Sequence, residues 1–521
     1  MECGRPRLPS SMDIVEIIMI KQGFNRRDFI KGTSALALTS FTSSPLLAQT
    51  GATQRLDWNT FRTTRHYSSL VNAIATMKEN GNPSDKRSWI YWVNAHVNFC
   101  PHGVPYFLAW HRGYLYYLEQ QLRAVSGNKS LVLPYWDYYA NPEMPAEFTN
   151  PSPLNPLYVP RLNTNVIAAL TLAPFAGTVT NMQRGLTNPF ETVFEDMPHN
   201  PVHNIIGNVM ADMQSPTDPI FFLHHANVDR LWSAWQQGGG GRTTPPANNA
   251  YWNGSFNYAG RLTMQRNLTI DTRSRLFYSY QNETMPTSLP VASNGADNED
   301  SFRLAAFGGG DQQLAQLAPR AGGGASQLVS RPGVRGFNPS RSRMVGPNRL
   351  ALGGVLQIPL DESSLSAQLA VDDASADLLQ RVLATVSRGP ATPYRSARVV
   401  LDNVSINDPG RNGGYFYYLY LNLPASTDLT NATGSYLLGS IGPFEIAGAA
   451  HRVHMRIEAG GNQPGTVRLA FPITVQLAEL LTQDPRRITM SFVRVSGDNS
   501  PGGPVIQIGE ARLELSPDEP V

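Results

Sequence analysis

Residues 218–232 read Asp-Pro-Ile-Phe-Phe-Leu-His-His-Ala-Asn-Val-Asp-Arg-Leu-Trp. Asp218 and Pro219 are typical of a helix start, because aspartate caps helix N-termini and proline fits the first turn. Large apolar residues then recur every three or four positions, which predicts a helix with one buried face. The residues of that face are Phe221, His225, Val228, Trp232 and Trp235. The pattern therefore places an imidazole among large apolar side chains.

A histidine pair lies shortly before this helix. Residues 195–203 read Glu-Asp-Met-Pro-His-Asn-Pro-Val-His. A short helix after Pro198 would carry His199 and His203 on one face, because residues four apart are neighbours on a helix surface. Together with His225, this region offers three imidazoles from two helices.

An earlier window offers three more imidazoles. Residues 92–112 read Trp-Val-Asn-Ala-His-Val-Asn-Phe-Cys-Pro-His-Gly-Val-Pro-Tyr-Phe-Leu-Ala-Trp-His-Arg. A helix is expected over 106–125, with His111 on its buried face. Two prolines just before it exclude a continuous helix, so His102 comes from a loop. Two helices and this loop could direct His96, His102 and His111 to one point.

Two sets of three histidines carry more information than one histidine does. A single histidine on an apolar helix face is usually a hydrogen-bonded core residue. Di-iron sites in helical bundles use glutamates and Glu-x-x-His pairs, which these sets lack. Imidazole-only coordination suits zinc or copper. A zinc ion held by three histidines would explain one set but not both.

The composition restricts the class of protein. The chain has 521 residues, 41% hydrophobic and 16% charged, which is enough for two or three domains. Its formal net charge is only +2, so no nucleic-acid partner is expected. A mean hydropathy of −0.26 argues against stable membrane insertion. Two cysteines, Cys3 and Cys100, are too few for a disulfide framework.

Four segments are expected along the chain. Residues 1–48 resemble a twin-arginine export signal that ends at a small-residue cleavage site, which implies a periplasmic or secreted protein. Residues 49–290 are rich in aromatic residues and histidine, and we expect the chemistry there. Residues 291–349 are a glycine-rich flexible linker. Residues 350–521 show short alternating runs typical of a β-sandwich, at 397–401, 415–423, 454–457, 467–471, 489–495 and 505–508.

Residues 92–235 resemble the paired copper-binding regions of the tyrosinase and catechol oxidase family. The resemblance rests on three motifs, Cys-x-His-x₈-His, Pro-His-Asn-x-Val-His and Asp-Pro-x-Phe-x-x-His-His-x-x-x-Asp. It implies a mainly α catalytic domain, a helical bundle around a type 3 dicopper site, followed by an all-β sandwich that shields it. Two copper ions would be the cofactors and O₂ the co-substrate. The implied ligands are His96, His102 and His111 for one copper and His199, His203 and His225 for the other.

The resemblance also assigns roles to residues beside the ligands. Cys100 would form a thioether with the His102 ring, the alternative being a buried free thiol. Phe221 would cover the copper and stack on substrate, or simply pack in the core. Glu195 and Asn200 would hold a water and help deprotonate a monophenol, although Glu195 could instead complement a helix dipole.

Further positions are expected around the site. His224 is turned about 100° from His225 on the helix, which places it beside the ligands or at the entrance. Asp229 would orient an imidazole, or act as a cap or a partner of Arg230. Residues 278–280, Tyr-Ser-Tyr, resemble the Tyr-x-Tyr that ends the catalytic domain in this family.

The function implied is a secreted phenol oxidase that hydroxylates monophenols and oxidises o-diphenols to o-quinones with O₂. The alternatives are a catechol or aminophenol oxidase without the hydroxylation step, and a haemocyanin-like O₂ carrier; a structural zinc protein is more distant. Small phenols, an activating protease and a copper chaperone are the expected partners. Shielding by the second domain would make the chain latent, with Phe444 as the expected blocking residue and Phe416 or His451 as alternatives.

Overall fold

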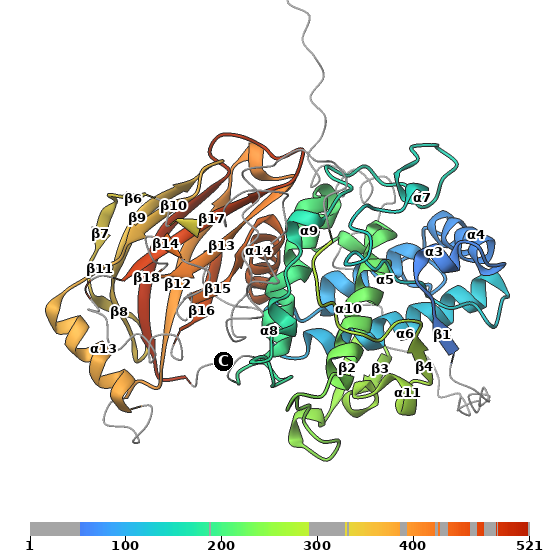
Figure 1. Cartoon of the computed structure of the whole chain (residues 1–521), viewed down its shortest axis with the longest axis horizontal. Coiled ribbons are helices and arrows are strands. Elements are labelled where there is room, and N and C mark those ends of the chain that lie inside the picture. Colours follow the sequence, from blue (N-terminus) through green and yellow to red (C-terminus); the bar gives the residue numbers. More distant parts are fainter. Residues whose placement is uncertain are drawn as a thin grey trace, which may run out of the picture. The chain divides into compact units, whose positions relative to one another are not determined.

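In a computed structural model, the chain folds into a mainly helical domain followed by a mainly β domain (Figure 1). The helical domain lies within residues 53–290. Residues 1–48, the expected export signal, and with them Cys3, lie outside the described part of the chain. The described residues are 53–186, 189–290, 329–330, 333–385, 393–422, 426–427, 436–458, 466–473, 486 and 488–518.

The helical domain contains four longer helices, α4, α5, α6 and α10, and several short ones. Its α-helices are α3 (Trp58–Phe61), α4 (His66–Glu79), α5 (Trp89–Phe99), α6 (Phe107–Ser126), α7 (Ala146–Thr149), α8 (Phe190–Phe194), α9 (Asn200–Ile206), α10 (Ile220–Gln237) and α11 (Thr272–Arg275). A π-helical turn, η3 (Glu195–His199), leads directly into α9. The short strands are β1 (Thr53–Arg55), β2 (Ser255–Ala259), β3 (Leu262–Gln265) and β4 (Tyr278–Tyr280).

Helices α6 and α10 confirm the two amphipathic helices predicted from the sequence. α6 begins just after Pro105, and α10 begins at Ile220, whose backbone N–H donates to the Asp218 carboxylate at 3.0 Å. That bond satisfies one of the free N–H groups at the helix start, as the predicted cap requires. The two helices pack against each other in the core of the domain.

The two ends of the helical domain are joined by a small parallel sheet. Strand β1 pairs with β4, the Tyr-Ser-Tyr segment expected to end this domain. The Arg55 guanidinium lies 3.8 Å from the centre of the Tyr278 ring and donates to Glu119 of α6 at 2.8 Å. Because Arg55 and Glu119 are both buried, this pair ties the sheet firmly to the helical core.

The β domain consists of two facing sheets. One sheet has the strand order β15-β13-β17-β10-β6, and the other has the order β11-β9-β18-β12-β16, with β7 and β8 also paired to β9. Strands β14 and β5 pair separately. The strands are β5 (Val329–Ser330), β6 (Val334–Arg335), β7 (Asn338–Ser340), β8 (Arg343–Gly346), β9 (Arg349–Leu360), β10 (Leu365–Gln368), β11 (Ala370–Val371), β12 (Ser396–Ile406), β13 (Tyr415–Leu421), β14 (Ser426–Thr427), β15 (Tyr436–Ile441), β16 (Arg468–Pro472), β17 (Thr489–Ser496) and β18 (Ile506–Ser516).

Two expectations for this domain need correction. Strands β5 to β8 precede residue 350, so the predicted linker over 291–349 overlaps the β domain. The domain is also not all β, because it contains α13 (Asp373–Thr385) and α14 (Pro443–Glu458). Residues 454–457, predicted as a strand, lie within α14, since alternation over four residues does not distinguish a strand from a helix.

Strand β13 shows how the β domain meets the helical domain. Every residue of β13 is buried, so the strand has no solvent-facing side. Tyr415, Tyr417, Leu419 and Leu421 pack between the two sheets, whereas Phe416, Tyr418 and Tyr420 join the core of the helical domain together with Val493 and Val495 of β17. Because successive side chains of a strand point to opposite faces, β13 contributes to two hydrophobic cores, one on each face.

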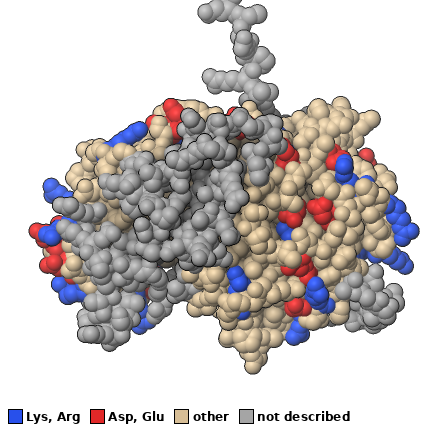
Figure 2. Space-filling view, viewed as in Figure 1, with Lys and Arg blue, Asp and Glu red and all other residues tan. Residues whose placement is uncertain are grey.

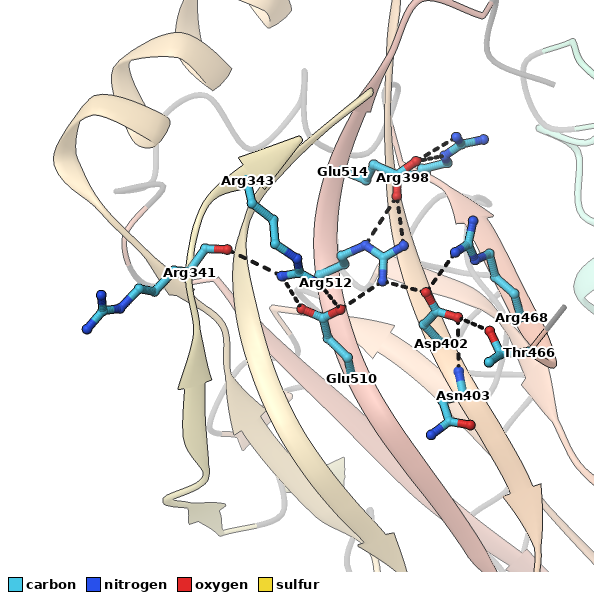
Figure 3. Close-up of polar contacts among 10 residues, drawn as sticks. All are labelled: Arg341, Arg343, Arg398, Asp402, Asn403, Thr466, Arg468, Glu510, Arg512 and Glu514. Carbon is cyan, nitrogen blue, oxygen red and sulfur yellow. Dashed lines mark hydrogen bonds and ion pairs between the residues drawn. The ribbon is translucent and has the colours of Figure 1, made fainter. Parts of the chain in front are cut away.

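The other sheet carries charge on its outer face. Along β18, Ala511, Leu513 and Leu515 point into the domain, and the residues between them form an ion-pair ladder with neighbouring strands (Figure 3). Arg512 is its centre, with 1% of its surface exposed. The ladder's salt bridges join Arg512 to Asp402, Glu510 and Glu514, and continue to Arg468, Arg343 and Arg398.

The visible surface mixes the two signs of charge. Basic and acidic side chains lie interspersed over the helical part in Figure 2, in keeping with the net charge of +2. Among the described residues, none of the helices combines the length and the apolar character needed to cross a bilayer.

Candidate metal centre

The first histidine cluster joins two helices and a loop. His96 lies on α5, His111 on α6, and His102 on the loop between them, as the prolines predicted. Their ring centres lie 5.3 to 5.7 Å apart, and the Nε2 atoms of His96 and His102 are separated by 3.2 Å. Each of the three, and Cys100, can offer one ligand atom within 4.8 Å of the others.

The second cluster has the same construction. His199 and His203 lie on consecutive turns at η3 and α9, and His225 reaches them from α10. The Nε2 atom of His225 lies 3.2 Å from that of His199 and 3.4 Å from that of His203. All three imidazoles are completely buried.

The opposite ring nitrogens hold the imidazoles in place. Nδ1 donates to a backbone carbonyl in His96 (Met213, 2.8 Å), His111 (Phe107, 2.9 Å) and His203 (Met210, 2.7 Å). A carbonyl can only accept, so these rings carry their proton on Nδ1 and present a bare Nε2 lone pair to the cluster centre. That tautomer is the one a metal ion requires.

The donor set fits a pair of bound cations. Burial, together with neighbouring imidazoles, lowers the pKa of His96, His111, His199, His203 and His225 well below the ordinary value, so these rings are neutral. Neutral lone pairs that converge at 3.2 Å cannot hydrogen-bond to each other. A metal ion between them would satisfy both, and imidazole ligands suit copper or zinc.

The two clusters also face each other. The rings of His111 and His225 stack at 4.1 Å between centres, and those of His102 and His199 stack at 5.5 Å. Two imidazoles of each set are therefore in contact with the other set. This arrangement fits one dinuclear centre, as the resemblance implies, and not two separate sites.

A family comparison agrees with this geometry. The profile described as the common central domain of tyrosinase matches residues 58–165 and 158–238, which include both clusters. Residues 58–238 thus resemble the central domain of the tyrosinase family. The family carries a type 3 dicopper centre, and the two histidine clusters could each hold one of its copper ions.

Individual relatives match this central part of the chain. Tyrosinase HcTyr1 of Hahella sp. (strain CCB-MM4) is 32% identical over 192 residues, which cover 29% of this chain and 40% of that protein. Hemocyanin 1 of Megathura crenulata is 32% identical over 174 residues, covering 27% of this chain and 5% of that protein. The chain thus matches less than half the length of either relative. The solved structure of latent apple tyrosinase (MdPPO1) aligns over 92% of this chain and 100% of its own, at 17% identity and a TM-score of 0.49.

Cys100 lies at the edge of the first cluster. Its Sγ atom is 3.4 Å from Nε2 of His111 and within 4.8 Å of a ring nitrogen of His102. Burial raises the pKa of this thiol well above its ordinary value, with a smaller contribution from Glu195. The thioether between Cys100 and His102 that the tyrosinase resemblance implies stays a prediction.

Glu195 holds the loop histidine of the first cluster. Its Oε1 accepts from His102 Nδ1 at 3.2 Å and from the Gly103 backbone at 2.7 Å, and Arg184 forms an ion pair with Oε2. Burial works against ionisation, but Arg184, His102 and Gly103 together lower the pKa of Glu195. Sequence reasoning missed Arg184, because a lone arginine in a loop carries no motif.

Asn200 and Phe221 lie where the resemblance puts them, in contact with the ligands. Asn200 Oδ1 is 2.8 Å from His199 Nδ1. The Phe221 ring is 4.1 Å from the His225 ring and 5.1 Å from the His96 ring, and it is completely buried. The sequence did not single out Phe107 as a neighbour of the ligands, although its ring lies 4.5 Å from that of His199.

The expectation for Asp229 needs correction, whereas His224 lies beside the ligands, one of the two places expected for it. Asp229 orients no imidazole among the described residues, nor does it pair with Arg230; it accepts from Arg112 at 2.5 Å and from Tyr278 and Tyr280 at 2.6 Å. A buried carboxylate is drawn to the nearest buried cation, here on α6. His224 is completely buried, so it is not an entrance residue, and its ring stacks on His199 at 5.2 Å.

The β domain contributes one ring to the histidine clusters. Phe444, at the first turn of α14, stacks on His203 with ring centres 4.1 Å apart and planes at 15°. It also meets the His102 ring edge-on at 5.0 Å. Phe416 is buried with Tyr418 in the core between domains, and His451 is hydrogen-bonded to the backbone of Val97 on α5.

Proposed function

We propose that this protein is a copper-dependent phenol oxidase that uses O₂ to convert o-diphenols to o-quinones. The observation that carries the proposal is the pair of facing clusters, each with three buried imidazoles directed by their Nε2 atoms. Two bound copper ions would supply the redox chemistry with O₂ and the phenol. The chain's own part is to hold six neutral imidazoles in the right tautomer and to exclude water around them.

Copper binding and catechol oxidation test this proposal together. The copper-supplemented protein should contain two coppers per chain and oxidise catechol. His111→Ala and His203→Ala each remove one ligand from a different cluster, so each should lose copper and more than about a hundredfold in rate. His66→Ala is the matched control, because the His66 ring contacts Asn128, two residues after the end of α6, instead of a ligand. Folded protein with one zinc and no copper would contradict the proposal.

We further propose that the enzyme hydroxylates monophenols, with Glu195 and Asn200 as the residues that receive and hold the phenol proton. The support is an ionised carboxylate and an amide oxygen in contact with one ligand of each cluster. The alternative, a catechol or aminophenol oxidase, would use Glu195 only to orient His102.

Replacing Glu195 with Gln separates these two possibilities. The amide keeps the shape and an acceptor for His102 but loses the negative charge. Tyrosine hydroxylation should then fall by about 10²- to 10⁴-fold, and catechol oxidation by much less. Equal losses on both substrates would assign Glu195 to orientation alone.

An O₂ carrier is the second candidate, because Hemocyanin 1 matches this chain with the same 32% identity as a tyrosinase. The two functions differ in turnover. Steady quinone formation over many catalytic cycles would exclude a carrier, and reversible O₂ uptake without quinone formation would exclude the oxidase.

We also propose that the intact chain is latent, because the Phe444 ring lies against His203 where a phenol ring would have to approach the centre. The glycine-rich segment between the two domains would be the site of an activating protease. Cleavage there should raise catechol oxidation severalfold without changing the copper content.

A further inference from the structure

Asn204 immediately follows the ligand His203 and lies completely buried under the β domain. Its side-chain Nδ2 donates to Glu445 Oε2 at 2.7 Å, and its Oδ1 accepts from the Phe444 backbone at 2.9 Å. Its backbone carbonyl accepts from Gly414 at 2.7 Å. One residue of α9 thus gives three hydrogen bonds to the β domain, two of them to the turn that carries the Phe444 ring.

The β-domain backbone is shaped to reach Asn204. A Cβ atom on Gly442 would lie 2.5 to 2.7 Å from the Asn204 side chain, and one on Gly413 would lie 2.8 Å from its carbonyl oxygen. Real Cβ atoms do not approach so closely, so both positions must be glycine for the contact to form. Two separate segments of the β domain are therefore fitted to this one residue, Gly442 to its side chain and Gly413 to its backbone carbonyl.

Glu445 has its own support within the β domain. Its Oε1 lies 2.5 Å from the Ser440 hydroxyl, which is also 3.1 Å from the carbonyl oxygen of Asp196 in η3. The pair of Asn204 and Glu445 therefore continues through Ser440 to the turn before His199. Arg452, two turns further along α14, donates separately to the carbonyl of His102 at 2.9 Å.

We propose that the Asn204–Glu445 pair is a latch that seats the first turn of α14 on the metal centre and so places Phe444 against His203. Asn204 is a positioning residue, because it contacts the blocking segment and not the reacting atoms. The inference rests on the proposed latency and adds the contact that controls it. The latch also gives a reason why the side chain of Asn204, the residue after His203, points toward the β domain.

Variants of Glu445 test the latch without touching α9. Glu445→Ala removes both acceptor oxygens, whereas Glu445→Gln keeps an oxygen for Asn204 Nδ2. Asn499→Ala is the matched control, because it loses a 2.7 Å hydrogen bond from its Nδ2 to the Leu162 carbonyl elsewhere in the same interface. Two quantities are measured in the full chain: the ratio of catechol oxidation after and before linker cleavage, and amide hydrogen exchange over residues 443–449.

For Glu445→Ala, the cleavage ratio should fall toward one, because the uncut chain is already active, and amides 443–449 should exchange about tenfold faster. Glu445→Gln and Asn499→Ala should resemble the wild type. Unchanged exchange of β12 amides shows that the β domain is still folded. If Glu445→Ala keeps both the latency and the amide exchange rates of the wild type, the latch proposal is wrong.

The exchange measurement also separates this inference from the latency on which it rests. If cleavage fails to activate even the wild type, the latency proposal is wrong. Faster exchange over 443–449 in Glu445→Ala would then still show that the pair seats α14, and unchanged exchange would reject the latch as well.

Discussion

Glu191 is a buried carboxyl group close to the charges of Glu195 and Arg184. Its Oε1 accepts a long 3.3 Å hydrogen bond from the Leu108 backbone, and its Oε2 has no partner within the described ranges. Burial raises the pKa of Glu191 to about 7, although Arg184 partly opposes this. The native state therefore keeps a proton that the unfolded chain releases above about 4.5, so stability falls as the pH rises from about 4.5 to about 7.

Glu191→Gln should remove this pH-dependent cost. The difference between a pKa of about 7 and the ordinary value is worth about 3 kcal/mol, which is the largest gain expected at pH 8. The gain should be small near pH 4.5, where the carboxyl group is protonated in the native state and about half protonated in the unfolded chain. Denaturant unfolding at pH 4.5, 6 and 8 measures it, and a gain that is constant with pH would contradict the assignment.

Cys100 gives a second test on a single side chain. Its position beside the cluster supports the predicted thioether to His102, which would remove two hydrogens from the mass. Intact-mass measurement of the copper-loaded protein should show this loss, and the denatured chain should contain no thiol that reacts with an alkylating agent. A titratable Cys100 would leave it as a buried free thiol.

The ligand histidines could be predicted because their positions depend on local rules. Spacings of four place His199 and His203 on one face, and the prolines around His102 force a loop. Arg184 and the carbonyl of Met213 could not be predicted, because each reaches the site through contacts between distant segments. Asp229 was misassigned for the same reason, since its cation lies on another helix.

Strand β18 carries the centre of the ion-pair ladder on the outer face of its sheet. Arg512 is surrounded by Asp402, Glu510 and Glu514, and the hydrogen bonds from Arg468 and Arg512 lower the pKa of Asp402 despite its partial burial. Removing a buried cation leaves its partners unpaired, which costs far more than removing an exposed one.

Arg512→Ala should therefore destabilise the protein by about 3 to 5 kcal/mol. Arg411→Ala is the control, because the pair of Arg411 and Asp408 is exposed and should be worth less than about 1 kcal/mol. Calorimetric unfolding of the two variants measures the difference. Equal and small effects would mean that the ladder is only a solvated surface network.

The helices with a clear apolar stripe were predictable, whereas α14 was not. α6 and α10 repeat their apolar stripe over several turns, which fixes both their type and their buried face. α14 was mistaken for a turn and a strand, because its polar face includes His451 and Arg452 and its sequence resembles a hairpin over short windows. Its contacts with α9, which decide its conformation, are distant in sequence.

At the level of the whole chain, the sequence indicated two domains but not how they meet. β13 reads as one apolar run, and only the structure shows that Phe416, Tyr418 and Tyr420 pack on the helical domain. That packing brings α14 over the histidine clusters.

Phe444→Ala should activate the uncut chain in part. Removing the ring opens the space in front of His203, while α14 stays anchored by Glu445 and Arg452, so catechol oxidation should rise severalfold yet remain below the rate after linker cleavage. The copper content should not change, because no ligand is altered. Phe416→Leu is the control, since it changes an aromatic ring of the same interface that does not touch the ligands. If Phe444→Ala is no faster than the wild type while cleavage still activates, the β domain shields the centre by covering it and not through this ring.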